Sequence, residues 1–252
     1  MLKYNRKKWR FPVLISTPTE GWVRYEWAHC RYGQVIPINW AAQGFDLNYS
    51  AIGYSIDDAY NLITHQAIKV GVEWLLLVED DVLLPGDCFV KMGRYMEERK
   101  YPVVSGLYFT KGVPSEPLLF RGRGNGAYKH WKWGEKVMCD GLPMGCLLIH
   151  MSILRWMSDH SEQYRVPTGE QVAKVFHTPR KVSFDILTWT SQRQEGTQDL
   201  YFFDRVIDEK ILEKTGWDEL AGEEFPFLCD TGIFCKHIDR GTGKMFPLKM
   251  EA

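Results

Sequence analysis

The feature that most constrains the fold is a run of five apolar residues, Trp74–Val78, followed at once by three acids. A run without alternating polar residues is typical of a strand covered on both faces. Candidate helices flank it: residues 55–70 have apolar side chains at helical spacing behind a candidate N-cap, Ser55, and Pro85 opens a second helix. Strands that alternate with helices favour parallel pairing. We therefore predict an α/β fold with an open, mostly parallel mixed sheet and helices on both faces.

Other short apolar runs are predicted to be strands of the same sheet. They are residues 12–17, 35–39, 103–107, 146–150, 227–229 and 234–237. A helix is expected over residues 197–212, with Thr197 as its N-cap, and a polar loop over residues 161–178. Pro, Gly and aromatic residues dominate after Gly112. We expect one continuous domain, with an α/β half over residues 1–112 and a mixed lobe over residues 113–252.

The composition excludes several classes of protein. Of the 252 residues, 45% are hydrophobic and 25% are charged, which is typical of a globular domain and not of a disordered chain. The formal net charge of −1 disfavours a globally basic nucleic-acid binder. No apolar run approaches the ~20 residues that span a bilayer, so we expect a cytoplasmic location. The six cysteines form no CxxC pair and are expected to be reduced core thiols.

The three acids after the central strand are the strongest candidate site. Ligands of open α/β sheets collect beyond the carboxyl ends of the strands. Glu79 and Asp81 are separated by one residue, and two carboxylates so close repel each other unless a cation lies between them. Hard oxygen ligands suit Mg²⁺ or Mn²⁺, which would bridge the carboxylates to a diphosphate. For this segment alone, a solvated acidic turn before the next helix is the alternative.

Residues 74–85, WLLLVEDDVLLP, resemble the strand and DxD motif of glycosyltransferases with the A-type (GT-A) fold, especially the large family 2-like group. The resemblance implies that Glu79 and Asp81 handle the divalent metal and a nucleotide-sugar, with Asp80 between them. Glu79 stands where the family usually has Asp. The GT-A fold is the nucleotide-diphospho-sugar transferase type of open α/β sheet.

Further segments resemble elements of this family in the same order along the chain. Residues 14–24, LISTPTEGWVR, are similar to the first strand and nucleotide-binding loop, and residues 141–150, GLPMGCLLIH, to a Gly-rich turn that borders the donor sugar. In related enzymes the helix that precedes the DxD strand often places an Arg or Asn near the nucleotide, and Asn61 lies in the corresponding predicted helix. The nucleotide-sugar contacts that the resemblance implies are Thr17, Pro18, Thr19, Asn61, Asp80 and Gly145.

Two later segments resemble the family's catalytic elements. Residues 195–206, EGTQDLYFFDRV, are similar to a segment whose Asp is the base of inverting members, which implies that role for Asp199. Residues 229–239, CDTGIFCKHID, resemble a terminal strand whose His often completes the metal site, which implies His237 as a ligand. The base would take the proton of an acceptor hydroxyl as its oxygen attacks the anomeric carbon. A first-turn helix acid and a hydrogen-bonded structural His are the alternatives.

The acceptor is the open part of the prediction. Residues 121–136, from Arg121 to Lys136, interleave basic and aromatic residues, a pattern typical of a polyanion contact or of a solvated hairpin. We predict a metal-dependent, inverting glycosyltransferase that uses Mn²⁺ or Mg²⁺ and, by family frequency, a UDP-sugar. The acceptor is a glycan, lipid, protein or modified DNA base. The alternatives are a viral-type transferase acting on hydroxymethylpyrimidine DNA bases, a nucleotidyltransferase, and a non-catalytic sugar-nucleotide-binding protein.

Overall fold

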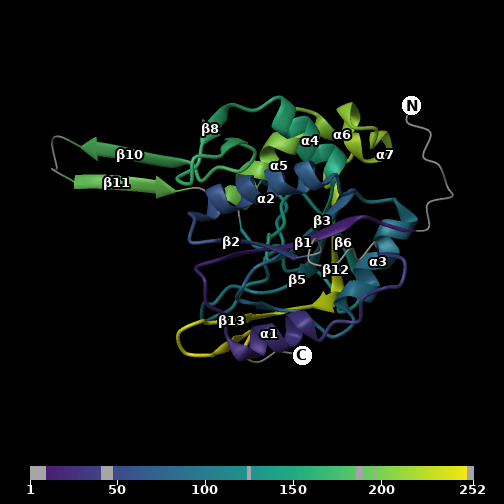
Figure 1. The fold of residues 1–252 in the computed structure, drawn as a ribbon. Helices are drawn as coiled ribbons and strands as arrows, with labels where there is room; N and C mark the ends of the chain where they lie inside the picture. Colours follow the sequence, from purple (N-terminus) through teal and green to yellow (C-terminus); the bar gives the residue numbers. More distant parts are fainter. Residues whose placement is uncertain (1–9, 41–47, 124–125, 186–189, 196, 249–252) are drawn as a thin grey trace.

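The computed structural model describes residues 10–40, 48–123, 126–185, 190–195 and 197–248. Its centre is a seven-stranded sheet (Figure 1). In spatial order the strands are β2 (Asn48–Ile52), β1 (Val13–Thr19), β3 (Trp74–Val78), β7 (Cys146–His150), β5 (Val103–Leu107), β12 (Phe227–Phe234) and β6 (Lys136–Cys139). Only β7 and β6 run against the other strands. The predicted α/β fold with a mostly parallel mixed sheet is therefore confirmed.

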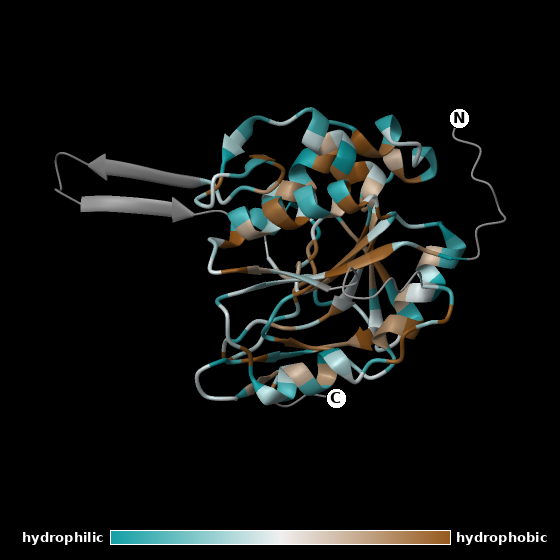
Figure 2. Cartoon of the chain, in the orientation of Figure 1, coloured by the Kyte–Doolittle hydropathy of each residue, from teal (hydrophilic) through white to brown (hydrophobic). Residues whose placement is uncertain are grey.

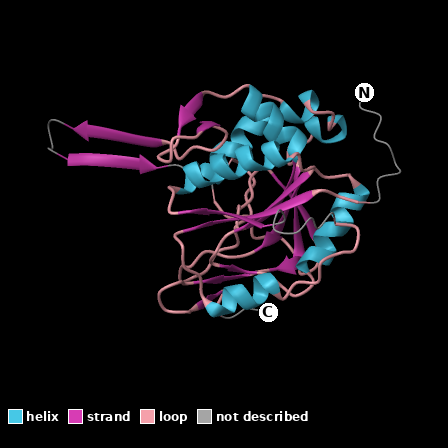
Figure 3. Cartoon of the chain, in the orientation of Figure 1, coloured by secondary structure: helices cyan, strands magenta, loops and turns pink. Residues whose placement is uncertain are grey.

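Helices cover both faces of this sheet (Figure 3). One face carries α2 (Ile56–Val70), α4 (Met151–Asp159), α5 (Gln198–Asp208), α6 (Ile211–Lys214) and α7 (Asp218–Ala221), and the other carries α1 (Tyr25–Tyr32) and α3 (Cys88–Glu98). The side chains of β3 alternate between the two layers: Leu75 and Leu77 pack with α2, whereas Leu76 and its same-face neighbours pack with α3. Both layers are apolar where they meet the sheet (Figure 2). This double burial explains why the central strand has no polar alternation.

Strands from both halves of the chain alternate within the central sheet. β7 lies between β3 and β5, and β12 lies between β5 and β6. Residues 1–112 and 113–252 thus contribute to the same sheet and the same two apolar layers.

Short strands complete the fold around this sheet. A three-stranded sheet joins β14 (Met245–Phe246), β13 (Lys236–Ile238) and β4 (Val82–Leu83), and two hairpins join β8 (Gln163–Arg165) to β9 (Gln171–Ala173) and β10 (Arg180–Asp185) to β11 (Thr190–Glu195). In the first of these, His237 pairs with Val82. That pairing brings β13 beside the acidic turn.

The helix predicted over residues 55–70 is confirmed, together with its ends. The Ser55 hydroxyl accepts a hydrogen bond from the Asp58 amide at 3.4 Å, as an N-cap does. Gly71, with φ of 78°, ends the helix in the left-handed conformation that glycine adopts without strain.

Three sequence predictions of secondary structure are wrong. Residues 35–39 form no strand: Pro37 lacks an amide proton, and the Val35 and Ile38 side chains are exposed, so β2 takes the place beside β1 instead. The helix expected over residues 197–212 ends at Asp208, because Lys210 has a φ of 52°. The loop expected over residues 161–178 contains the β8–β9 hairpin.

The hairpin considered for residues 121–136 is also absent from the described part of that segment, in which β6 begins only at Lys136. Three glycines with positive φ interrupt the extended backbone: Gly122, Gly126 and Gly134. Two of the basic side chains make ion pairs within the chain. Arg123 contacts two acids of α5 at 2.7 Å, and Lys129 contacts Glu116 at 2.6 Å.

Five of the six cysteines are buried, as expected of core thiols, whereas Cys30 is partly exposed, and all six are free thiols. Burial raises the pKa of the Cys139 thiol to about 12, so it stays protonated at neutral pH. None of the helices within the described ranges combines the length and the apolar character that crossing a bilayer requires.

Candidate active site at the end of the central strand

A tight turn follows β3 and separates the three acidic side chains. The Glu79 amide donates to the Gly145 carbonyl at 3.1 Å, and the Glu79 carbonyl accepts from the Val82 amide at 3.2 Å and from the Trp27 indole at 2.7 Å. These bonds fix the backbone at the carboxyl end of the strand, where ligands of α/β sheets bind. Glu79, Asp80 and Asp81 then enter three different environments.

Glu79 lies among buried tyrosines. The Tyr60 hydroxyl donates to Oε1 at 2.6 Å, and the Tyr108 hydroxyl lies 3.4 Å from Oε2. Burial, followed by the charges of Asp81 and Asp199, raises the pKa of Glu79 to about 8, although the tyrosine hydrogen bonds act in the opposite direction. At neutral pH the Glu79 carboxyl is therefore mostly protonated.

Asp81 lies between two nitrogen groups. Its Oδ2 is 2.5 Å from the Lys111 ammonium and 3.5 Å from His237 Nε2. The other ring nitrogen of His237, Nδ1, is 2.8 Å from the Phe109 carbonyl, which can only accept, so Nδ1 carries a proton. Although burial alone would raise the pKa of Asp81, the hydrogen bonds and charges of His237 and Lys111 lower it to about 2.

Asp80 points toward the end of β1. Both of its oxygens accept from Arg240 Nη1, at 3.1 and 3.3 Å, and Thr19 also donates to its carboxyl. Burial raises the pKa of Asp80, against these hydrogen bonds. Thr17 and Pro18, the other predicted nucleoside contacts on β1, are buried beside β2. Asp80 thus ties the acidic turn to the predicted nucleotide-binding segment.

Asp199 lies in the first turn of α5, and its Oδ1 accepts a hydrogen bond from the Leu200 amide at 3.0 Å. Burial raises the pKa of this carboxyl. Its charge in turn raises the pKa of Tyr60, Tyr108 and Glu79. Asp199 and Glu79 therefore share one electrostatic environment, on the tyrosine side of the turn.

The structure brings the four predicted catalytic and metal residues into one neighbourhood. Asp81 lies 3.5 Å from His237, and the charges of both Asp81 and Asp199 act on Glu79. Within the described ranges, no group of three or more His, Cys, Asp or Glu side chains is placed to hold a metal ion. The predicted three-residue ligand set is not assembled in this structure, and hydrogen bonds to two tyrosines occupy the Glu79 carboxyl. Asp81 and His237 offer two ligand atoms, and the Lys111 ammonium lies 2.5 Å from the Asp81 oxygen that faces His237.

Gly145 is buried where the β7 strand begins. Its amide donates to the Tyr108 hydroxyl at 2.8 Å, and a Cβ on this residue would lie 2.4 Å from that oxygen and 2.5 Å from Val82 Cγ2. Only glycine fits such a close approach. Gly145, which was predicted to border the donor sugar, therefore packs against Tyr108, the tyrosine that also contacts Glu79.

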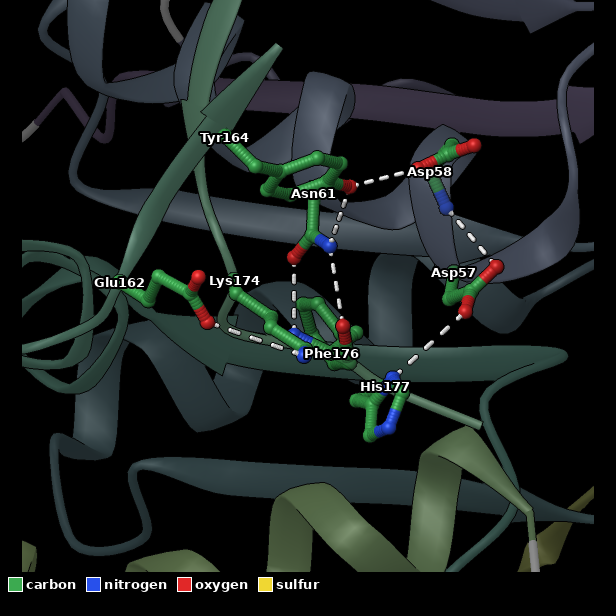
Figure 4. A pocket seen from close by; sticks show the side chains of 8 residues that line it. All are labelled: Asp57, Asp58, Asn61, Glu162, Tyr164, Lys174, Phe176 and His177. Atoms are coloured by element: carbon green, nitrogen blue, oxygen red, sulfur yellow. Dashed lines mark hydrogen bonds and ion pairs between the residues drawn. The ribbon is translucent and has the colours of Figure 1, made fainter. Parts of the chain in front are cut away.

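Asn61 lies apart from the acidic turn, in a cavity of about 210 Å³ at the start of α2 (Figure 4). Its amide nitrogen donates to the Tyr164 hydroxyl and the Phe176 carbonyl, both at 2.9 Å. Its oxygen accepts from the Val175 and Phe176 amides at 2.9 and 2.8 Å. With four such bonds inside the chain, Asn61 anchors the segment after β9 and presents no free group to a nucleotide.

The sequence reasoning missed Tyr60, Tyr108 and Lys111 as members of this site. The latter two follow the end of β5, which is parallel to β3 in the sheet. Because the carboxyl ends of parallel strands meet at one edge, the residues after every predicted parallel strand were a signal that could have found them.

Searches against protein-family models and against curated proteins give no match for this chain. A solved structure, A197 from STIV, is similar to it with a TM-score of 0.50 over 93% of this chain and 92% of that chain. The two sequences are 14% identical. The similarity is therefore one of fold, over nearly the whole of both chains.

Proposed function

We propose that this chain transfers a glycosyl group from a nucleotide-sugar, with UDP-sugars as the first donors to test, to an acceptor hydroxyl in the cytoplasm. The observation that supports it best is the pair of carboxyls at the end of β3. Glu79, with a pKa of about 8, and Asp81, with a pKa of about 2, are separated by one residue. Neighbouring carboxyls whose environments separate their pKa values are typical of sites with divided acid, base and electrostatic roles.

The Asp81 side offers positive charge for a leaving diphosphate. The Lys111 ammonium lies on Asp81, and the Arg240 guanidinium lies on Asp80. Such donors stabilise the negative charge that develops as the bond between the anomeric carbon and the phosphate oxygen breaks. We leave the predicted Mn²⁺ or Mg²⁺ out of this proposal, because the three residues expected to hold it do not meet.

The Glu79 side supports the proton transfer. Asp199 accepts the proton of the acceptor hydroxyl while that oxygen forms a bond to the anomeric carbon and the electron pair of the broken bond leaves with the nucleoside diphosphate. Burial raises the pKa of Asp199, which makes its carboxylate a stronger base. The protonated Glu79 nearby adds no second negative charge. Direct displacement of this kind inverts the anomeric configuration.

A modified DNA base is not the acceptor that we propose. The alternative depended on the basic and aromatic residues of 121–136, and two of those basic side chains, Arg123 and Lys129, are paired with acids of the same chain. A hydroxyl of a glycan, lipid or protein remains the acceptor class to test.

A panel of nucleotide-sugars tests the proposal. A donor that binds the folded chain raises its melting temperature, and incubation with acceptors then releases the nucleoside diphosphate. NMR of the product's anomeric proton reports inversion. We expect one nucleotide class to stabilise the protein and to be consumed. No stabilisation and no consumption by any UDP-, GDP-, ADP-, CDP- or dTDP-sugar, with or without Mn²⁺, would contradict it.

A further inference from the structure

We infer that Lys111 is the resident cation of this site: its ammonium binds the donor diphosphate in the place predicted for a divalent ion, so nucleotide binding needs no metal. This inference rests on the proposed function, since it names the group that receives the diphosphate. It departs from the metal dependence that the sequence resemblance implied.

The first support is the contact itself. Lys111 Nζ lies 2.5 Å from Asp81 Oδ2, and His237 Nε2 lies 3.5 Å from the same oxygen. The Asp81 side chain is 17% exposed and the Lys111 side chain 32%, so the pair is partly shielded but still open to solvent. An ammonium has three N–H donors, and Asp81 takes one of them. The other donors can reach phosphate oxygens that approach from solvent.

The second support is the loop that carries Lys111. The Leu118 amide donates to the Tyr108 carbonyl at 3.0 Å and the Thr110 amide to the Glu116 carbonyl at 2.9 Å, so the loop after β5 folds back on itself. The same loop supplies the Phe109 carbonyl that binds His237. Lys111 therefore belongs to a closed loop that is bonded to the site.

The third support is the small number of ligand atoms and carboxylate charges that the site offers to a divalent ion. A divalent ion on Asp81 Oδ2 and His237 Nε2 would bind the same oxygen that Lys111 Nζ already contacts at 2.5 Å. The ion and the ammonium would then repel each other at one carboxylate. Glu79, the carboxyl that would offset the added charge, is bonded to Tyr60 and Tyr108. The chain's own cation is thus better matched to the single carboxylate than a divalent ion is.

The test measures binding of nucleoside diphosphates (UDP, GDP, ADP, CDP and dTDP) by calorimetry, in EDTA and in Mn²⁺. For the wild type we expect the same dissociation constant in both buffers, within about threefold. In EDTA, Lys111→Gln is expected to weaken binding by roughly ten- to a hundredfold, the cost of losing a charged hydrogen bond. Mn²⁺ is expected to restore part of this loss, because the substitution frees Asp81. Lys129→Gln, on an ion pair of the surface, is the matched control and is expected to bind like the wild type.

The outcomes separate this inference from the proposed function. Wild-type binding that disappears in EDTA and returns with Mn²⁺ overturns the role of Lys111 and leaves the proposed function intact. Equal binding by Lys111→Gln and the wild type in EDTA also overturns it. If the wild type binds no nucleotide in either buffer, the proposed function itself fails. Melting temperatures of Lys111→Gln and Lys129→Gln show whether these variants are folded. If Lys111→Gln unfolds, Lys111→Arg takes its place in the test. Because it keeps the positive charge, Lys111→Arg is expected to retain most of the nucleotide binding.

Discussion

The turn after β3 places two carboxyl side chains, Glu79 and Asp81, in opposite chemical environments. Glu79 enters a buried space between Tyr60 and Tyr108 and keeps its proton, whereas Asp81 faces Lys111 and His237 and loses it. Their pKa values, about 8 and about 2, differ although one residue separates them in the sequence. The spacing of acids in a sequence therefore does not determine which of them act together. The elements that meet each side chain do.

The elements on each side explain the difference. The tyrosines of the Glu79 side come from α2 and from the end of β5, where buried rings exclude water. The nitrogen groups of the Asp81 side come from the loop after β5 and from β13, nearer the surface. Desolvation controls the first carboxyl and paired charges control the second. We expect proton chemistry on the Glu79 side and phosphate binding on the Asp81 side.

The largest expected effect comes from Asp199→Asn, which removes the base but keeps the size of the side chain. The rate of glycosyl transfer should fall by roughly 10²–10⁴-fold, the usual contribution of a general base. Nucleotide binding, which we assign to the Asp81 side, should stay within about threefold. Steady-state rates and calorimetry measure the two effects separately. Asp208→Asn, on the exposed face of the same helix, is the control and should leave both unchanged.

If Asp199→Asn lost nucleotide binding as strongly as rate, the division of roles between the two sides would be wrong. A transfer rate equal to that of the wild type would remove Asp199 from the reaction.

The next largest effect is expected from Gly145→Ala. The new methyl group would lie 2.4 Å from the Tyr108 hydroxyl and 2.5 Å from Val82, so the packing between the two sides must move. We expect the free energy of unfolding to fall by about 2–3 kcal/mol, as measured by urea denaturation. Gly86→Ala is the control: nothing lies within 4 Å of its added Cβ, and its effect should stay within about 0.5 kcal/mol. Equal stabilities of the two variants would show that Tyr108 is not held where we describe it.

The pH dependence of stability distinguishes the two carboxyls directly. The folded-state pKa of Glu79, about 8, is above its ordinary value of 4.5, so its stabilising contribution is present below about pH 4.5 and is lost as the pH rises toward 8. The folded-state pKa of Asp81, about 2, is below 3.8, so its contribution is present above that pH and is lost as the pH falls toward 2. The two windows do not overlap.

Urea unfolding of Glu79→Gln and Asp81→Asn at a series of pH values tests these signs. Relative to the wild type, Glu79→Gln should gain stability as the pH rises from about 4.5 to 8. Asp81→Asn should gain relative stability only as the pH falls below about 4. Parallel curves for the two variants would mean that the carboxyls share one environment.

The fold followed from local sequence signals, whereas the assembly of the site did not. The apolar run of β3 predicted a strand covered on both faces, and Ser55 and Gly71 predicted the ends of α2, because each signal depends on a few neighbouring residues. The partners of Glu79 lie 19 and 29 residues away along the chain. No local pattern shows that these tyrosines meet that carboxyl, and the resemblance grouped Glu79 with the metal ligands instead.

Residues 35–39 show a second limit of prediction from the sequence alone. Their apolar side chains favoured a strand, but Pro37 interrupts hydrogen bonding and β2 pairs with β1 over five register positions. Competition between segments for one edge of a sheet is a tertiary property. It cannot be read from the apolar content of either segment.

The smallest expected effect comes from Tyr60→Phe, which removes the 2.6 Å hydrogen bond to Glu79 and keeps the buried ring. The free energy of unfolding at neutral pH should fall by about 1 kcal/mol, and Tyr32→Phe, at an exposed ring, should change it by less than about 0.5 kcal/mol. Because this hydrogen bond lowers the pKa of Glu79, its loss should raise that pKa further and move the pH window of Glu79 upward. The pKa of Asp81 should stay near 2, since Lys111 and His237 are untouched. Titration of the two carboxyls by NMR measures both values, and a shift of Asp81 as large as that of Glu79 would show that the two sides are not independent.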